Sequence, residues 1–275
     1  MSLFPFTVDS PLLLVGCGNM GSALARGWLK AGLDSKAFFS IDPYFADKTV
    51  EGLPNEQIVA SVTDLPEGIS PRAIVMAVKP QMMPDVLPGI KPIIDEQTLI
   101  ISVAAGTTVT HYEDYFGDVG VVRTMPNTPA AVAKGITGMV ANELASDSDK
   151  AVAEQLLSAI GDVVWVEKES LIDSVTAVSG SGPAYVFYLV EALAAAGVSN
   201  GLEADVAMKL ARQTIVGAGA LLEASSESAA ELRRKVTSPN GTTAAALDHL
   251  MAEDGLAPLM RKAVTAAKKR SRELS

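Results

Sequence analysis

The sequence predicts an α/β fold in which a doubly wound parallel sheet is followed by an all-helical C-terminal domain. Short apolar runs alternate with stretches of helical spacing over residues 1–166. From there to the end, segments rich in Ala, Leu and Val keep a period of about 3.6 residues and contain no convincing strand. A chain of 275 residues is long enough for two ordinary domains. We therefore expect domains at 1–166 and 167–275.

Several apolar runs in the first half have the length and composition of strands. The clearest are 11–16, 36–42, 72–78, 98–106 and 119–125, with 138–142 and 163–166 as further candidates. The segments between them, such as 22–31, have helical spacing. Strands that alternate with helices are typical of a parallel, doubly wound sheet.

The second half carries signals for the start of helices. Ser170 with Asp173, and Ser228 with Glu231, fit the Ser-x-x-acid capping box. These signals, together with the apolar periodicity, predict a helical domain of ordinary size.

Composition disfavours several classes of function. The net charge of −10 argues against sequence-independent binding of nucleic acid, because phosphate attraction needs a basic face. No uninterrupted apolar run reaches the ~18 residues of a membrane helix, since Glu191 interrupts the longest one, 185–198. The N-terminus lacks the basic region of a secretory signal, and Cys17 is the single cysteine. We expect a cytoplasmic protein without nucleic-acid, membrane or metal partners.

A glycine-rich loop follows the first predicted strand and precedes the first predicted helix. It reads Gly16-x-Gly18-x-x-Gly21, in which the glycines permit a tight turn, close approach of a pyrophosphate and close packing of helix on strand. The helix N-terminus then offers amides to phosphate. This register favours a Rossmann-type dinucleotide site over a bare turn. The expected contacts in this loop are Gly16, Cys17, Gly18, Asn19, Met20 and Gly21.

Asp42 ends the second predicted strand, where ribose recognition occurs in dinucleotide-binding folds. A carboxylate there can accept hydrogen bonds from ribose hydroxyls and would repel a 2′-phosphate. The nearest cation is Lys48. Asp42 therefore favours NADH modestly, although it could equally form a turn before Pro43.

Two later loops leave strands at the same expected edge of the sheet. The first supplies Ala77, Val78, Lys79 and Pro80, of which Lys79 could reach phosphate or ribose. The second supplies Ala104, Ala105 and Gly106, whose small side chains suit close approach to a nicotinamide ribose. Together they outline a cleft at the switch point of the sheet.

The stretch SPNGTTAAALDHL, residues 238–250, places hydroxyl side chains where an apolar helix begins. One interpretation is a plain helix cap, in which Ser238 or Thr242 bonds free amides. The other is an anion site with a hydroxyl directed at a reacting atom. Spacing alone leaves these two alternatives open.

Six motifs follow one another in a characteristic order: VGCGNMGSALARG, AVKPQ, SVAAGTT, RTMPNTPAAVAKG, AVSGSGPAYVFYLVEALAAAGV and VTSPNGTTAAAL. Through them the chain resembles the pyrroline-5-carboxylate reductase family over essentially its whole length. The resemblance implies a Rossmann domain, a helical dimerisation domain and reduction of the cyclic imine to L-proline by NADPH or NADH. It also implies a homodimer, sometimes gathered into larger rings, whose active sites form where helical domains of two subunits interleave.

The resemblance assigns residues as well. It places Ser238 and Thr243 in contact with substrate, with the amides of Gly241 and Thr242 nearby. Thr243 would hydrogen-bond the ring nitrogen while hydride reaches C5, and Asn127 would lie near the nicotinamide.

The chain also departs from the family pattern. Asn240 stands where many relatives carry Gly, but Asn also tolerates positive φ. The segment SIDP, residues 40–43, lacks the element that suits NADPH in many relatives, so coenzyme preference is not carried over.

Rival interpretations are a non-catalytic NAD(P)-binding redox sensor, or a related imine or hydroxyacid dehydrogenase. A 3-hydroxyacid dehydrogenase needs a lysine on the helix at 183–193, which has none. A 2-hydroxyacid dehydrogenase needs a histidine paired with an acid, and His111 and His249 lie outside every motif. A sensor would have no reason to keep Ser238 and Thr243.

Overall fold

A computed structural model describes residues 4–44 and 50–274. The chain forms two compact units: one runs up to Gly180 and includes the C-terminal stretch from Lys268, and the other is Ser181–Ala267. The boundary expected at 166/167 marks the change from strands to helices, since the last strand ends at Trp165. The compact units divide later, because the helical turns up to Gly180 pack with the sheet.

The first unit is built on an eight-stranded sheet with the order β3-β2-β1-β4-β5-β6-β7-β8. The strands are β1 (Leu12–Val15), β2 (Phe38–Ile41), β3 (Ile58–Val59), β4 (Ala73–Met76), β5 (Leu99–Ser102), β6 (Gly120–Met125), β7 (Gly135–Ala141) and β8 (Gly161–Trp165). Neighbours are parallel except β6 and β7. The predicted α/β class is therefore confirmed, with an antiparallel step at β7. The sequence gives no sign of β3, because two residues carry no periodicity.

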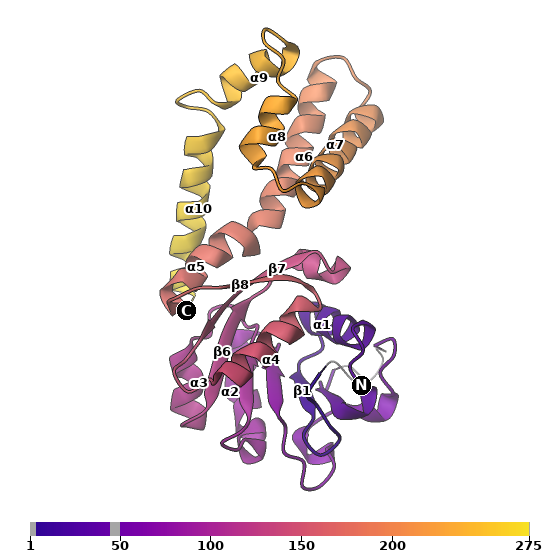
Figure 1. The fold of residues 1–275 in the computed structure, drawn as a ribbon, viewed down its shortest axis with the longest axis vertical. Coiled ribbons are helices and arrows are strands. Elements are labelled where there is room, and N and C mark those ends of the chain that lie inside the picture. The colour runs from indigo at the N-terminus through magenta and orange to yellow at the C-terminus, as the bar shows by residue number, and fades with distance from the viewer. Residues whose placement is uncertain (1–3, 45–49, 275) are drawn as a thin grey trace. The chain divides into compact units, whose positions relative to one another are not determined.

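Helices cover both faces of this sheet (Figure 1). They are α1 (Asn19–Lys30), α2 (Met83–Ile90), α3 (Val109–Phe116), α4 (Asp147–Ser158) and the short α5 (Ile172–Val175). Alternate strand residues point to opposite faces, so Leu12 and Leu14 pack towards α1 and α4, whereas Leu13 and Val15 pack towards α2 and α3. Strands buried on both faces explain the continuous apolar runs in the sequence.

Short helical turns connect these elements. They are the 3-10 turns η1 (Ser35–Ala37), η2 (Asn55–Gln57), η3 (Val62–Asp64), η4 (Pro80–Met82), η5 (Lys91–Ile93), η6 (Thr128–Val132) and η7 (Glu169–Leu171), and the π-turn η8 (Thr176–Gly180).

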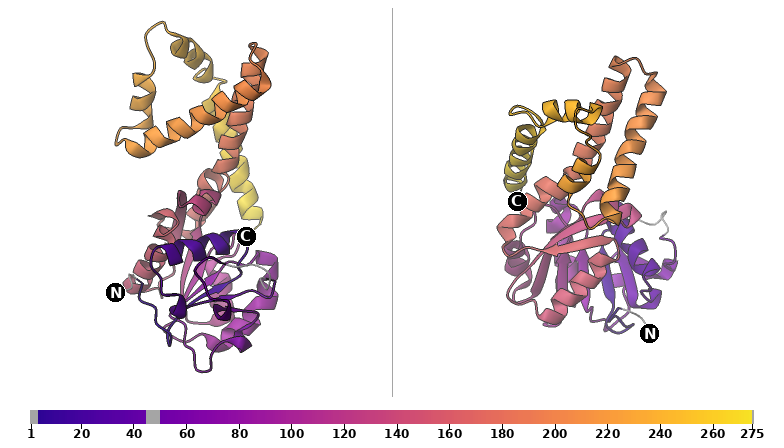
Figure 2. Two further views of the ribbon diagram at one scale, coloured as in Figure 1. Left: turned by 90° about the vertical axis from the view of Figure 1, so that its right-hand side faces the viewer. Right: turned by 45° about the horizontal axis from the view of Figure 1, so that its top comes forward.

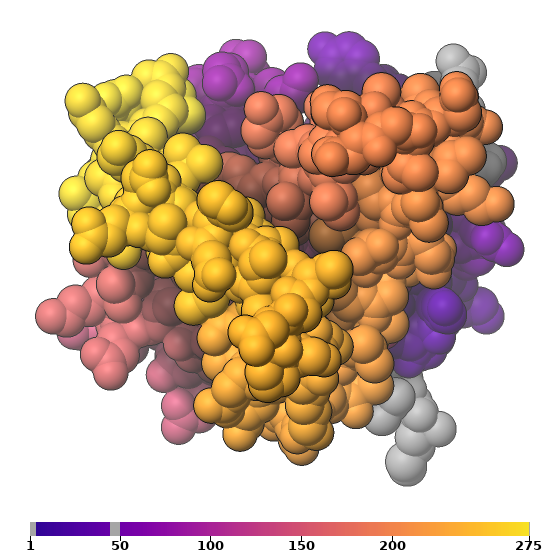
Figure 3. Space-filling view, turned by 90° about the horizontal axis from the view of Figure 1, so that it is seen from above, coloured from indigo at the N-terminus to yellow at the C-terminus, as the bar shows by residue number. Residues whose placement is uncertain are grey.

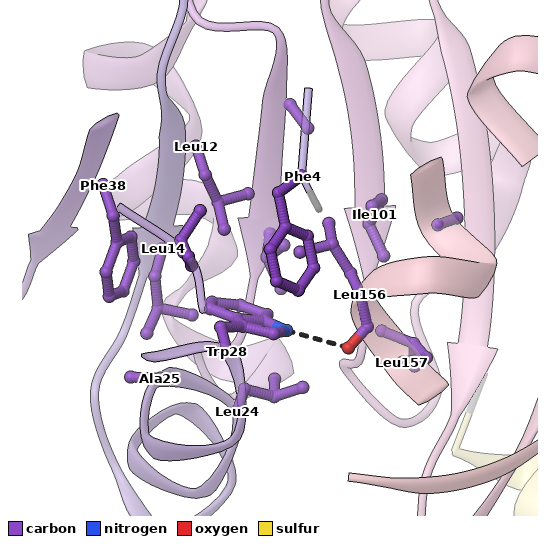
Figure 4. Close-up of a cluster of buried hydrophobic side chains, with 14 of the residues drawn as sticks. Phe4, Leu12, Leu14, Leu24, Ala25, Trp28, Phe38, Ile101, Leu156 and Leu157 are labelled. Atoms are coloured by element: carbon purple, nitrogen blue, oxygen red, sulfur yellow. Dashed lines mark hydrogen bonds between the residues drawn. The ribbon is translucent and has the colours of Figure 1, made fainter. Parts of the chain in front are cut away.

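Trp28 of α1 anchors the face that α1 shares with α4. Its side chain is fully buried, and its indole Nε1 donates to the carbonyl oxygen of Leu156 at 2.9 Å (Figure 4). Its ring also meets Phe38 edge-to-face, with ring centroids 5.5 Å apart. One side chain thus joins α1, β2 and α4.

The second unit contains the remaining helices, shown from two further sides in Figure 2. They are α6 (Gly182–Ser199), α7 (Ala204–Ala224), α8 (Ala229–Lys235), α9 (Thr242–Leu250) and α10 (Leu256–Glu273), whose last turns belong to the first unit. α6 and α7 pack side by side, with the backbone of Gly197 close to Ala207.

Of the two predicted capping boxes, one is confirmed and one is wrong. The box at Ser228 and Glu231 begins α8. Ser170 lies inside η7 instead of preceding a helix, so it caps nothing. The Asp173 carboxylate accepts from the Ser271 hydroxyl at 2.7 Å and lies 3.5 Å from Arg272, so it fastens the end of α10 beside α5.

The second unit keeps much of its apolar surface exposed. Among its described residues, the buried ones are Ala194, Ala207 and Ala211, all small. Phe187 and Leu221 are 63% and 62% exposed, and Figure 3 shows side chains of the orange-to-yellow helices at the surface of one face.

The exposed apolar surface also bears on whether a helix of this chain is long and apolar enough to cross a membrane. By length and composition the helical stretch Glu169–Ser199 could cross a membrane, although Glu191 interrupts it, and 6% of its most apolar window is buried within the chain. The expectation that no stretch meets the criterion is therefore too strict. An apolar helix left uncovered in a single chain is equally expected at a subunit interface.

Candidate dinucleotide cleft and anion-binding loop

A cleft of about 420 Å³ lies at the carboxyl ends of β1, β2 and β4. Strand order reverses between β1 and β4, so the cleft occupies the switch point where open α/β sheets bind ligands. Its lining includes these residues that the sequence singled out: Gly16, Gly18, Asp42, Ala77, Val78 and Lys79. Both the volume and the position suit part of a dinucleotide.

The three glycines of the loop have different surroundings. Gly16 has φ +94°, and a Cβ there would lie 2.7 Å from Val78. A Cβ on Gly21 would lie 2.1 Å from the carbonyl oxygen of Gly16, so this glycine lets α1 approach the loop. A Cβ on Gly18 would meet no described atom within 4 Å. Gly16 and Gly21 thus serve the protein's own packing, whereas the space at Gly18 is open to a ligand.

The first turn of α1 presents free amides beside that open space. The helix begins at Asn19, and no side chain caps its N-terminus. The amides of Asn19, Met20 and Gly21 therefore have no intrahelical acceptor and are available to an anion. This arrangement fits a pyrophosphate without a basic side chain.

The Asp42 carboxylate links the glycine-rich loop to the turn that follows β2. Its Oδ2 accepts from the Cys17 amide at 2.7 Å, and its Oδ1 accepts from the Tyr44 amide at 2.9 Å. The second contact is the turn that the sequence offered as an alternative to ribose binding. Because each carboxylate oxygen can accept more than one hydrogen bond, the turn and ribose recognition are compatible. Lys48 lies outside the described residues.

Lys79 is the only cation among the described residues that line the cleft, and Asp42 and Asp85 are its acidic neighbours there. It is exposed and precedes η4, which begins at Pro80. A lysine before a chain-turning proline can be merely solvated, but the position of Lys79 at the cleft also lets it reach a phosphate.

The loop after β5 supplies Ala104, Ala105 and Gly106, the last with φ +80°. These residues lie at the carboxyl end of β5, next to β4 in the sheet, but not in the lining of the cleft itself. Ala104 is buried, whereas Ala105 is exposed and so leaves backbone accessible to a ligand.

Asn127 is 8% exposed and occupied with backbone contacts. Its Oδ1 accepts from the Ile136 amide at 3.0 Å, and its Nδ2 donates to the Ser179 carbonyl at 3.1 Å. It therefore fixes the turn after β6 to β7 and to η8, a role that its sequence context does not reveal.

Several residues of the cleft escape sequence reasoning. Tyr44 and Ser61 line it. Tyr44 follows Asp42 by two positions, and Ser61 follows the end of β3 by two positions. A signal for Ser61 exists, since Ser61 and Asp64 form a capping box for η3 that fits the Ser-x-x-acid pattern. Tyr44 carries no such signal beyond its nearness to Asp42.

The loop at 238–243 is described within the second unit. Gly241 donates to the Ser238 carbonyl at 3.0 Å, and Asn240 between them has φ +55°, as its tolerance of positive φ predicts. α9 begins at Thr242, and no side-chain hydrogen bond caps it. The plain cap is therefore wrong: neither Ser238 nor Thr242 bonds the free amides, which remain available with the Thr243 hydroxyl half-buried beside them.

Other chemistry is sparse. The described residues contain no group of three or more His, Cys, Asp or Glu that could hold a metal ion. His111 lies on α3 and His249 on α9, each outside the cleft and the loop.

Both halves of the chain match families of known proteins. One family model, described as pyrroline-5-carboxylate reductase dimerisation, matches residues 169–274, and another, described as NADP oxidoreductase coenzyme F420-dependent, matches 12–106. The pyrroline-5-carboxylate reductase of Pseudomonas aeruginosa is 39% identical, with 96% of each chain covered.

Solved structures agree with the sequence relatives. That of the Coxiella burnetii pyrroline-5-carboxylate reductase has a TM-score of 0.87 and 34% identity, covering 97% of this chain and 99% of the other. That of the Plasmodium falciparum pyrroline carboxylate reductase, with NADP bound, has a TM-score of 0.79 and 31% identity, covering 98% and 99%. Relatives matched over their whole length at this identity show that the chain belongs to the pyrroline-5-carboxylate reductase family.

Proposed function

We propose that this chain reduces L-1-pyrroline-5-carboxylate to L-proline with NAD(P)H, the last step of proline biosynthesis, as a cytoplasmic enzyme. The observation that carries the proposal is the coexistence of an uncapped helix start beside the Thr243 hydroxyl with an open dinucleotide cleft. The first suits a small carboxylate that bears an imine, and the second suits the coenzyme. Full-length relatives named for this reaction support it.

The cofactor would lie along the cleft of the first unit. The amides of Asn19, Met20 and Gly21 would hold the pyrophosphate over Gly18, where a Cβ would meet no atom of the described residues within 4 Å. Asp42 and Tyr44 would face the adenosine ribose, and Lys79 a phosphate or ribose. When bound, NAD(P)H supplies the hydride that the reaction consumes.

The remaining cofactor contacts are assigned to segments in the cleft and next to it. The loops with Ala77, Val78 and Pro80, and with Ala104, Ala105 and Gly106, would approach the second half of the dinucleotide. Asn127 would act through the backbone that it fixes. Cys17 would act through Asp42, whose Oδ2 accepts from the Cys17 amide.

The loop of the second unit would hold the substrate. The amides of Thr242 and Thr243 would receive the carboxylate, with Ser238 beside them. The Gly241 amide donates to the Ser238 carbonyl, so Gly241 would contribute by holding the loop in shape. The Thr243 hydroxyl would hydrogen-bond the ring nitrogen and keep the imine in line as the nitrogen becomes an amine. Since the imine can bind already protonated, positioning supplies most of the rate and no protein acid is required.

The second unit would also form the homodimer. Many of its exposed apolar residues lie on α6 and α7, within the region that the dimerisation family model matches. The burial of Ala194, Ala207 and Ala211 alone cannot stabilise helices of this length, so a partner's apolar surface is needed.

The direct test is oxidation of NADH and NADPH followed at 340 nm, with pyrroline-5-carboxylate and with a plain 2-keto acid in parallel. The proposal expects oxidation with the imine only. Oxidation with the keto acid instead would indicate a hydroxyacid dehydrogenase. Tight coenzyme binding without any oxidation would favour the redox sensor.

A further inference from the structure

A buried hydroxyl network lies directly beneath the loop that connects β5 to α3. Tyr112 of α3 is fully buried, and its hydroxyl lies 2.9 Å from the Ser102 hydroxyl at the end of β5. The Ser102 Oγ accepts from the Ala104 amide at 3.3 Å, and the Thr107 side chain also hydrogen-bonds Tyr112. The network therefore contacts the loop at both of its ends.

The polar groups are costly to bury unless they bond one another. Burial raises the pKa of Tyr112 to about 12, which keeps the phenol protonated and able to donate. The Tyr112 hydroxyl also points towards the Met83 sulfur, 3.9 Å away. A phenylalanine at 112 would fill the same apolar space, so the hydroxyl serves the contacts with Ser102 and Thr107.

A second set of contacts fixes the exit of the same loop. The Glu169 carboxylate accepts from the Val109 amide at 2.8 Å and pairs with Arg123 at 2.7 Å. The Arg123 side chain is only 6% exposed. The loop at 103–108 is thus held from below by hydroxyls and at its end by a partly buried ion pair.

The position of this loop gives the network a function. Asp42 and Tyr44 place the adenosine half of a dinucleotide over β2, on one side of the switch point. The other half must then lie over β4 and β5, where Ala105 and Gly106 expose backbone. We propose that Tyr112 is a positioning residue that, through Ser102 and Thr107, holds the β5–α3 loop against the nicotinamide half of the coenzyme.

This inference rests on the proposed coenzyme use. It predicts that loss of the Tyr112 hydroxyl weakens binding of the whole coenzyme but not of fragments that lack nicotinamide. Tyr112→Phe removes the hydroxyl and keeps the ring. We expect NADPH and NADH to bind about threefold to tenfold more weakly, the cost of one lost hydrogen bond. Fragments that lack nicotinamide, 2′-phospho-ADP-ribose and ADP-ribose, should bind as in the wild type. A purely structural loss would lower the unfolding temperature without changing the ratio of affinities.

The matched control is Tyr115→Phe, three residues further along the same helix. Its ring lies 5.3 Å from the Lys91 amine, a contact that phenylalanine preserves. Calorimetric titration of the full-length protein with all four ligands measures the ratio, and Thr107→Val replaces Tyr112→Phe if that variant does not fold.

The proposal is supported if the ratio of coenzyme to fragment affinity falls in Tyr112→Phe and not in Tyr115→Phe. Equal weakening of coenzyme and fragment, or no change in either, overturns the positioning role and leaves the reductase proposal intact. Failure of the wild type to bind either fragment or coenzyme overturns the cofactor site itself, and the positioning role with it.

Discussion

The two units of the chain bury their apolar residues to very different extents. In the first, large side chains such as Trp28, Tyr112 and Phe38 are fully buried on both faces of a sheet. In the second, the buried described residues are alanines, and Phe187 and Leu221 are mostly exposed. The first unit can therefore be stable within one chain, whereas the proposed homodimer would cover the exposed apolar surface of the second. Cofactor binding and assembly should accordingly respond to different substitutions.

The largest loss of stability should follow Trp28→Ala, because it empties the centre of the α1–α4 face. Truncation of a buried large aromatic residue costs about 3–5 kcal/mol of unfolding free energy. Urea unfolding measures it. Trp165→Ala is the control, since Trp165 is only partly buried and donates to the exposed Glu154. Equal losses in the two variants would contradict the account of the core.

Phe187→Asp should separate the chains while leaving the first unit folded. A charge placed in an apolar interface weakens association by about 2 kcal/mol. Analytical ultracentrifugation reports the oligomer, and coenzyme titration reports the first unit. Val8→Asp, at a position 56% exposed in the first unit, is the control and should change neither. A Phe187→Asp protein that still dimerises would place the interface elsewhere.

Thr243→Ala should lower kcat about tenfold to a hundredfold, the range for a lost hydrogen bond to a charged group. Coenzyme affinity should not change, because Thr243 is not among the residues that line the dinucleotide cleft. Thr243→Ser should restore much of the rate. Thr242→Ala keeps the amide and removes a hydroxyl that caps nothing, so steady-state kinetics should show a much smaller effect. Comparable losses at 242 and 243 would contradict the assigned role.

The smallest expected effect concerns acid stability in the first unit. Burial opposes ionisation of Asp149, but the Ser146 hydroxyl and amide and the Arg72 guanidinium outweigh it and hold the pKa of Asp149 below its ordinary value of 3.8. A lowered carboxyl pKa stabilises the folded state above that value, and the stabilisation is lost as pH falls through the folded pKa.

Asp149→Asn should therefore be less stable than the wild type at neutral pH, and the difference should shrink below about pH 4. Thermal unfolding across pH measures this. Asp147→Asn, at a fully exposed position on the same helix, should show almost no difference. A gap that widens at low pH would reverse the predicted sign.

Features that depend on local spacing were readable from the sequence. The strands that end at Val15 and Ile41 and the register of Gly16, Gly18 and Gly21 follow from short-range patterns. The tolerance of Asn240 for positive φ belongs to the same class. Such patterns placed the cleft at the correct edge of the sheet.

Features that join distant segments were not readable. The bonds of Asn127 to Ser179 and of Glu169 to Val109 connect residues far apart in the chain. The two-residue strand β3 has too little length for a period. Whether the helix start at 242 is capped depends on side-chain geometry that composition does not fix. In each case the tertiary fold decides which groups meet, so local sequence patterns cannot show it.

The most direct test of the central claim follows the transferred hydrogen. Pyrroline-5-carboxylate is incubated with the protein and with NADH or NADPH that carries deuterium at both C4 positions of the nicotinamide, and the product is analysed by mass spectrometry and NMR. The account predicts L-proline with one deuterium at C5. Recovery of unreacted imine, or of proline without deuterium at C5, would contradict hydride transfer to this substrate.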